Sequence, residues 1–240
     1  MKSLFIIPGA LLFFSTAWSQ VETAEMSADF KEMSKFGSRA SGFEGYQTYS
    51  SGIVNGSQFF NPNWSPGTIT TINNEKVGKN YLFLFDKVRQ ELFMKWKDSS
   101  VILLADKNQI SSFTLNTDKA HYFVAAGTYD PSNKGNYFEV LVSNEKGYTL
   151  LKLVKTKFVK ADERDIEKQR LGDIYDSFQD QVTYYVSFNK GLPQPITLKE
   201  KNMLKVLTSV KDKVSGYFEQ HPENTVDESF LVGVIESINS

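Results

Sequence analysis

The residues that could do chemistry are few and scattered along the chain. There are two histidines, His121 and His221, and no cysteine. Zinc sites need His or Cys ligands at short, regular spacings, and no such pair or HExxH motif occurs. No GxSxG nucleophile elbow, P-loop or GxGxxG turn is present either. The sequence therefore predicts no catalytic residue, no cofactor and no metal site.

Each histidine has an ordinary structural interpretation. His121 lies in "KAHYFVAA", where it would begin a strand as an edge residue. His221 precedes Pro222 at the end of an expected helix, where it would complement the helix dipole. We interpret both as structural.

Paired carboxylates are the remaining enzymatic possibility, because hydrolases that use two carboxylates leave no short motif. Asp86, Glu91 and Asp106 flank expected strands, where acidic turn residues are common. A hydrolase with such unrecognised carboxylates stays an alternative.

Aromatic side chains could serve binding, since they stack on sugars or peptides. The candidates are Trp64, Trp96, Tyr129 and Tyr137. Aromatic residues that recur every second position in strands usually lie in the core, and this favours the core for Trp96. Trp64 and Tyr129 lie beside proline and turn residues, and for them both interpretations remain open.

Composition limits the class of protein. The chain has 240 residues, 40% hydrophobic and 23% charged, so it can form a core. Aromatic residues reach 14%, which favours strands. The net charge of -1 gives no basic field for nucleic acid. Without cysteine there is neither a disulfide nor a lipid-bearing cysteine after the leader.

The N-terminus has the pattern of a secretory signal peptide over residues 1–19. Lys2 precedes an apolar stretch over 4–14, and Ala17 and Ser19 are small residues at the positions that favour cleavage before Gln20. We therefore expect an exported protein, periplasmic or secreted, with no membrane span in the mature chain.

Residues 20–56 are expected to form a loosely structured lead-in, with a short helix through Met26–Phe36 and an edge strand near 46–54. From residue 57 the pattern becomes that of strands. "YLFLF" and "ELFMKW" predict a hairpin over 81–96 whose two faces are both apolar. Such a hairpin belongs in the middle of a sheet, covered on both sides.

A second hairpin is predicted around the turn "SNEKG", with strands over 138–142 and 148–154 and a positive φ at Gly147. The charged segment 160–181 is interpreted as a solvent-exposed excursion, with a short helix near 164–170 and a functional lid as its alternative. A further strand is expected over 182–188.

Two capped amphipathic helices close the chain. "TLKE" and "TVDE" are capping-box patterns that begin at Thr197 and Thr225. The first helix carries apolar residues at helical spacing from Met203 to Tyr217, and the second from Phe230 to Ile238. Together they predict a helical hairpin over about 198–239 whose apolar side packs on the sheet.

The order of these features resembles a group of uncharacterised exported β-rich proteins of Bacteroidota. The segments that carry the resemblance are "SQFFNPNWSPGTI", "YLFLFDKVRQELFMKW", "YFEVLVSNEKGYTLLKL", "VTYYVSFNKG" and "ITLKEKNMLKVL". They lie within residues 57–240. The resemblance implies an envelope or secreted location and transfers no functional residue.

Together these patterns predict an α+β fold: an antiparallel, meandering β-sheet, curved into a sandwich or partial barrel, with the C-terminal helical hairpin packed on it, in one domain over 57–240. The expected function is that of a non-enzymatic envelope protein acting by protein interaction or ligand binding. Its partner would be an unknown envelope protein or a small ligand. A small-ligand carrier with a cavity between sheet and helices is a second alternative, beside the hydrolase.

Overall fold

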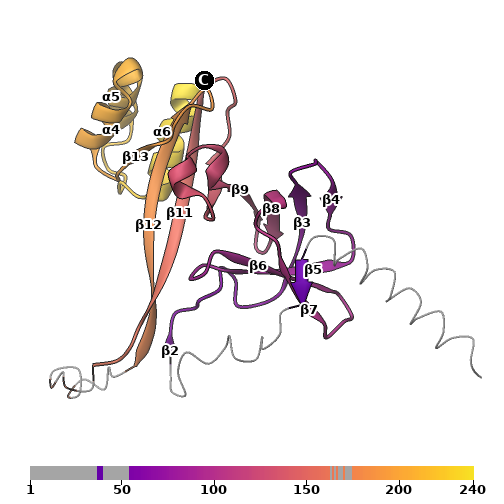
Figure 1. The fold of residues 1–240 in the computed structure, drawn as a ribbon. Coiled ribbons are helices and arrows are strands. Elements are labelled where there is room, and N and C mark those ends of the chain that lie inside the picture. Colours follow the sequence, from indigo (N-terminus) through magenta and orange to yellow (C-terminus); the bar gives the residue numbers. More distant parts are fainter. Residues whose placement is uncertain (1–36, 40–53, 163, 165, 167–169, 171–174) are drawn as a thin grey trace, which may run out of the picture. The chain divides into compact units, whose positions relative to one another are not determined.

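The computed structural model describes residues 37–39, 54–162, 164, 166, 170 and 175–240 (Figure 1). Two compact units divide the chain, residues 1–36 and 37–240, and all described residues belong to the second. The predicted signal peptide, the predicted helix through Met26–Phe36 and nearly all of the predicted edge strand over 46–54 lie outside the described residues. So does most of the predicted helix over 164–170, of which Ile166 and Arg170 are helical.

The described part of the chain is rich in strands and ends in helices. The strands are β1 Gly37–Arg39, β2 Val54–Asn55, β3 Ser65–Thr71, β4 Lys76–Val77, β5 Tyr81–Asp86, β6 Glu91–Trp96, β7 Ile102–Ala105, β8 Ile110–Asn116, β9 Ala120–Ala125, β10 Tyr137–Val142, β11 Tyr148–Val159, β12 Asp176–Phe188 and β13 Gln194–Ile196. The helices are α4 Glu200–Val206, α5 Lys211–Gln220 and α6 Glu228–Asn239, with short 3-10 turns η1 Ala126–Thr128, η2 Pro131–Asn133 and η3 Thr208–Val210.

The strands form one open sheet with the order β1-β7-β6-β5-β3-β8-β9-β10-β11-β12-β13. β4 adds to β3, and β2 adds to β12. Among the described strands, β2 and β12 are the parallel pair and every other pairing is antiparallel. The predicted α+β class and antiparallel meander are therefore confirmed.

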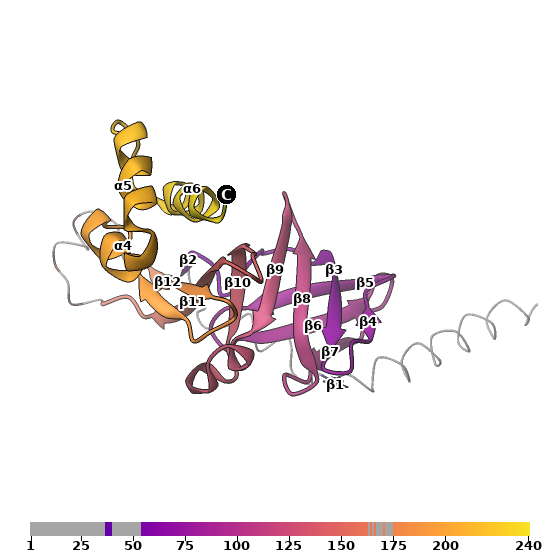
Figure 2. The same ribbon diagram turned by 90° about the horizontal axis from the view of Figure 1, so that it is seen from above.

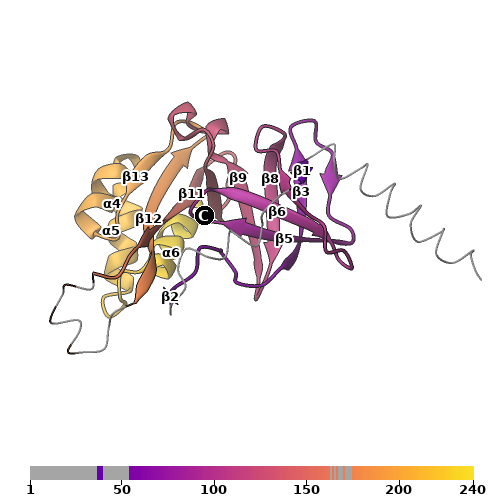
Figure 3. The same ribbon diagram turned by 60° about the horizontal axis from the view of Figure 1, so that its bottom comes forward.

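Strand β3 joins two parts of this sheet. Its first residues pair with β5, Ser65 opposite Phe83, and its later residues pair with β8, beginning with Gly67 opposite Leu115. A Cβ atom on Gly67 would lie 2.1 Å from the carbonyl oxygen of Thr114, so only glycine allows this close approach. Figure 3 shows β5 and β6 crossing the direction of β8 and β9 as a result.

The hairpin of β5 and β6 is covered on both faces, as its sequence predicts. Phe83 and Phe85 alternate with Leu84, and each of the three side chains is less than 5% exposed. Leu84 packs with Phe59 and Phe93 on one face. On the other face Phe85 contacts a group of aromatic rings from β8, β9 and β10, namely Phe113, Phe123 and Tyr137. The stretch from 81 to 96 is thus the interior of the sheet.

The turn of that hairpin docks on the far part of the sheet. The Gln90 side chain accepts from the Tyr137 amide and donates to the Val154 carbonyl, at 3.1 and 2.9 Å. Lys87 Nζ lies 2.7 Å from an oxygen of Asp180 on β12. These bonds tie the turn between β5 and β6 to β10, β11 and β12.

The second predicted hairpin is β10 and β11, with a bulge between Val140 and Val142. The predicted positive φ at Gly147 is wrong, because the positive-φ glycines among the described residues are Gly56 and Gly135. Gly147 is instead a close-approach position. A Cβ atom there would lie 2.5 Å from Oδ1 of Asn239, which bonds the backbone of Tyr148 through both of its amide atoms.

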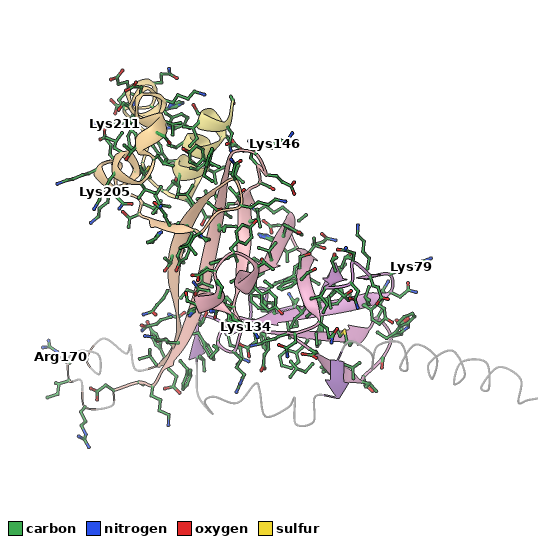
Figure 4. The ribbon with its side chains drawn as sticks, turned by 45° about the horizontal axis from the view of Figure 1, so that its top comes forward. Lys79, Lys134, Lys146, Arg170, Lys205 and Lys211 are labelled. Carbon is green, nitrogen blue, oxygen red and sulfur yellow. The ribbon has the colours of Figure 1, made fainter. Side chains whose placement is uncertain are left out.

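The C-terminal helices pack on β10, β11 and β13 (Figure 2). The space between sheet and helices is filled by buried apolar side chains: Leu150, Val186, Ile196, Met203, Leu207, Val214, Phe230, Leu231, Val234, Ile235 and Ile238. The predicted apolar seams are thus confirmed. The opposite side of α4 and α5 carries exposed lysines, and Figure 4 shows Lys205 and Lys211 pointing outward.

Both predicted capping boxes are wrong in detail. α4 begins after Lys199 with no side-chain cap, and Asn202 Oδ1 accepts a hydrogen bond from the Thr197 amide instead. α6 is capped by Asp227, which accepts from the Phe230 amide at 2.9 Å. The first predicted helix is also broken by η3, because Leu207 leaves helical geometry with ψ of 41°.

Candidate functional site

A groove with a volume of about 550 Å³ lies beside the start of β9, and we call it the His121 groove. One wall is the loop that enters β3 and contributes Phe60, Asn61, Trp64 and Ser65. The other wall comprises His121 and the turn between β8 and β9, with Asn116, Thr117 and Asp118. Both walls follow from the pairing of β3 with β8, which brings segments about fifty residues apart side by side.

Hydrogen bonds fix the loop that carries the aromatic wall. The Phe60 amide donates to the carbonyl of Phe85 at 2.9 Å. Asn61 Nδ2 donates to Ser65 Oγ at 2.8 Å, which closes the loop on itself. Trp64 is half-buried, and the ammonium of Lys95 lies 5.1 Å from the centre of its ring. The aromatic wall is therefore held in place by contacts within the protein.

His121 connects the groove with the interior of the sheet. Its Nδ1 lies 2.6 Å from Oε1 of Glu139, whose side chain is 7% exposed. Its Nε2 lies 3.4 Å from Oδ1 of Asp118, whose side chain is 80% exposed. The edge of the Phe60 ring packs on the imidazole, with 4.8 Å between ring centres. Because Glu139 holds Nδ1, the ring presents Nε2 to the groove.

Asp118 gives the groove an anionic rim. The Thr117 hydroxyl donates to Asp118 Oδ1 at 2.6 Å, and with the His121 contact this lowers the pKa of Asp118 to about 2. The carboxylate is therefore ionised in any ordinary buffer.

Behind His121, a row of polar side chains crosses four strands. Glu139 pairs across the sheet with Lys152, and Lys152 with Tyr184, so the three side chains share one face. Lys152 Nζ lies 3.7 Å from Glu139 Oε2 and 2.8 Å from Glu228 Oε2. The row ends where Tyr184 donates to Glu228 at 2.8 Å, at the first turn of α6. It separates the aromatic core under β5 from the apolar core under the helices.

The ionisation of this row follows from its partners. Burial acts to raise the pKa of Glu228, but hydrogen bonds from Lys152 and Tyr184 outweigh it and lower the pKa. Burial and the hydrogen bond to Glu228 raise the pKa of Tyr184. Glu139 Oε2 accepts no hydrogen bond from the described residues, so Lys152 balances its charge over a longer distance.

The hydroxyl groups of the groove have partners other than the imidazole. Ser65 Oγ bonds with Asn61 and with the Asn63 carbonyl. The Thr117 hydroxyl bonds with Asp118. Glu139 does not line the groove, so Asp118 is the carboxylate there. Among the described residues no cluster of His, Asp and Glu could hold a metal ion.

The acidic residues considered from the sequence hold turns. Asp86 is fully buried and accepts from the amides of Val88 and Arg89. Glu91 lies opposite Asp86 in the same hairpin. Asp106 accepts from the Asn108 amide in the turn after β7. None of the three lines the His121 groove.

Of the four aromatic candidates, Trp64 lines the groove. Trp96 packs edge-on against Tyr81, with 5.0 Å between ring centres. Tyr129 packs on the Phe138 ring, and Tyr137 is 3% exposed in the aromatic core. His221 stacks on Tyr217 after α5 and bonds the Tyr217 carbonyl, as its structural interpretation predicts.

The comparisons with known proteins give a short result. No family model, curated protein or solved structure matches this chain. The resemblance to exported Bacteroidota proteins therefore stays a prediction. Within the described residues, none of the helices has the length and apolar character needed to span a membrane.

Sequence reasoning missed the polar row and the place of His121 at one end of it. One signal was available, because Glu139 and Lys152 interrupt the apolar strands "YFEVLV" and "YTLLKLV" at interior positions. Charged residues at such positions are usually paired. Recognising that pair required the register of β10 and β11, which the bulge after Val140 shifts.

Proposed function

We propose that this is a non-enzymatic exported protein that binds a small ligand in the His121 groove. The observation that carries the proposal is the fixed pair of walls: an aromatic wall and a polar wall whose imidazole is oriented by a buried carboxylate. Its volume is in the range of ligand sites, about 300–1,000 Å³.

Export is proposed from the signal-peptide pattern of residues 1–19, with cleavage near Ser19/Gln20. The alternative of a carrier with its cavity between sheet and helices is less well supported, because buried apolar side chains fill that space. The hydrolase alternative lacks a second carboxylate in the groove.

The test is a fragment screen against the purified protein, read by ¹H–¹⁵N correlation spectra. We expect the shifted resonances to include the Trp64 indole and the amides of Asn116 and Thr117, and the fragments to be recovered unchanged. Trp64→Ala should remove these shifts, and Tyr122→Ala, on the opposite face of β9, should keep them. Shifts confined to other surfaces would refute the groove as the site, and conversion of the fragments would refute the non-enzymatic role.

A further inference from the structure

We infer that the ligand of the His121 groove is a neutral carbohydrate, presented as one or two sugar rings. This inference rests on the proposed function, since it names the class of ligand that the groove takes. It is carried by three properties of the lining: its charge, its hydrogen-bonding groups and its aromatic wall.

The charge of the groove is nearly balanced. Neither lysine nor arginine is among the described residues that line it, so an anionic ligand would find no fixed cation inside. Asp118 supplies one negative charge at the rim. Lys95 over the Trp64 ring supplies positive charge next to it. Neither a strong anion nor a strong cation therefore gains much attraction here.

Behind the groove, one ammonium compensates part of the charge of two carboxylates. Glu139 and Glu228 face Lys152, and the His121 imidazole lies between Glu139 and the groove. The buried carboxylate therefore orients the imidazole, and Lys152 compensates part of its charge.

The hydrogen-bonding groups favour a ligand with several hydroxyls. Nδ1 of His121 faces the Glu139 carboxylate and Nε2 faces the Asp118 carboxylate, so both ring nitrogens already have carboxylate partners. The Asp118 side chain is 80% exposed at the rim, so its carboxylate oxygens can accept further hydrogen bonds from a ligand. A ligand hydroxyl can donate there, and the Asn116 carboxamide beside it offers both a donor and an acceptor. Adjacent hydroxyls of a sugar match such a set.

The aromatic wall favours the C–H face of a sugar ring. Phe60 and Trp64 contribute apolar ring surface to the lining of the groove. A pyranose has both properties in one ring, with apolar C–H groups on its face and hydroxyls at its edge. A purely apolar ligand would displace water from the exposed Asp118 carboxylate without replacing its hydrogen bonds, and this costs binding energy.

The test is a titration of the purified protein with four groups of probes, followed by Trp fluorescence and ¹H–¹⁵N spectra. The carbohydrate probes are glucose, galactose, N-acetylglucosamine, cellobiose, maltose and lactose. The other groups are spermidine as the cation, inorganic phosphate as the anion, and the tripeptides Ala-Ala-Ala and Gly-Phe-Gly.

We expect at least one carbohydrate to bind saturably and to shift the Trp64 indole and the Asn116 and Thr117 amides. Trp64→Ala and Asp118→Asn should each weaken its binding at least tenfold. The control variants Tyr122→Ala, on the opposite face of β9, and Asp98→Asn, in the turn between β6 and β7, should bind as the wild type does.

The outcomes separate the two claims. If spermidine, phosphate or a tripeptide saturates the groove and no carbohydrate does, the ligand class is refuted and the binding function stands. If no probe of any group shifts the groove resonances, the carbohydrate inference falls, and the fragment screen decides the binding function by itself. A carbohydrate that binds with equal affinity after Trp64→Ala and Asp118→Asn binds elsewhere and also refutes the inference.

Discussion

Replacing Lys152 with methionine is the sharpest test of the polar row. The lysine side chain is 18% exposed and contacts Glu139, at 7% exposure, and Glu228, at 36%. Lys152→Met keeps the length of the side chain but leaves both carboxylates without their shared cation. Removing one partner of a buried ion pair costs about 3–5 kcal/mol. Because Glu228 is partly exposed and Glu139 keeps His121, we expect about 2–3 kcal/mol.

The assay is urea unfolding at pH 7, followed by Trp fluorescence and far-UV circular dichroism. The midpoint should fall while the denaturant slope stays constant, since the surface exposed on unfolding is unchanged. The control is Lys157→Met, an exposed lysine on the same strand with no ion pair among the described residues, and it should cost less than about 0.5 kcal/mol.

A double variant decides whether charge is the cause. Lys152→Met with Glu139→Gln removes the uncompensated carboxylate and should recover about 1 kcal/mol or more of the loss. Two results would contradict a charge network in this row. One is a Lys152→Met variant as stable as the wild type. The other is a double variant that loses more free energy of unfolding than the two single variants lose together.

Three further predictions concern pH, packing and export. The lowered pKa of Glu228 means that its contribution to stability is present above the unfolded-state pKa, about 4.3, and is lost as the pH falls through the folded-state pKa. Urea midpoints of Glu228→Gln should therefore fall less steeply with pH below about pH 5 than those of the wild type. An equally steep fall in both proteins would contradict this. A Cβ atom on Gly233 would lie 2.0 Å from the Tyr217 hydroxyl, so Gly233→Ala should cost about 1–3 kcal/mol in urea unfolding. Tyr217→Phe in the same chain should recover part of that loss, and Gly216→Ala, with open space around it, is the control. Finally, N-terminal sequencing of the exported protein should begin at Gln20, and an intact Met1 on the mature protein would refute the leader.

The strands and helices were largely predictable because their periodicity reflects local geometry. Alternation in "YLFLF" and "ELFMKW" predicts β5 and β6 and their double coverage, and the structure buries Phe83 and Leu84 on opposite faces. The seam from Met203 to Val214 likewise marks the buried side of α4 and α5. Period alone was enough for these elements.

The join at β3 and the groove were not predictable from such patterns. Nothing local to "SPGTITT" indicates that the strand changes partner from β5 to β8 after Pro66, because that depends on the backbone contact at Gly67. The groove arises from this join, so His121 could not be placed opposite Trp64. The predicted caps failed for other reasons. Asp227 rather than Thr225 has the geometry to cap α6, and α4 begins after Lys199 without any side-chain cap.

The two earliest described strands occupy distant positions in the sheet. β1 covers the free side of β7, and β2 covers part of β12. A truncation that begins at residue 57 would therefore uncover backbone donors and acceptors at both places at once. Unpaired strand edges can pair with strands of another molecule. A molecule shortened in this way would have two such edges, so its copies could associate into linear oligomers and not only into dimers.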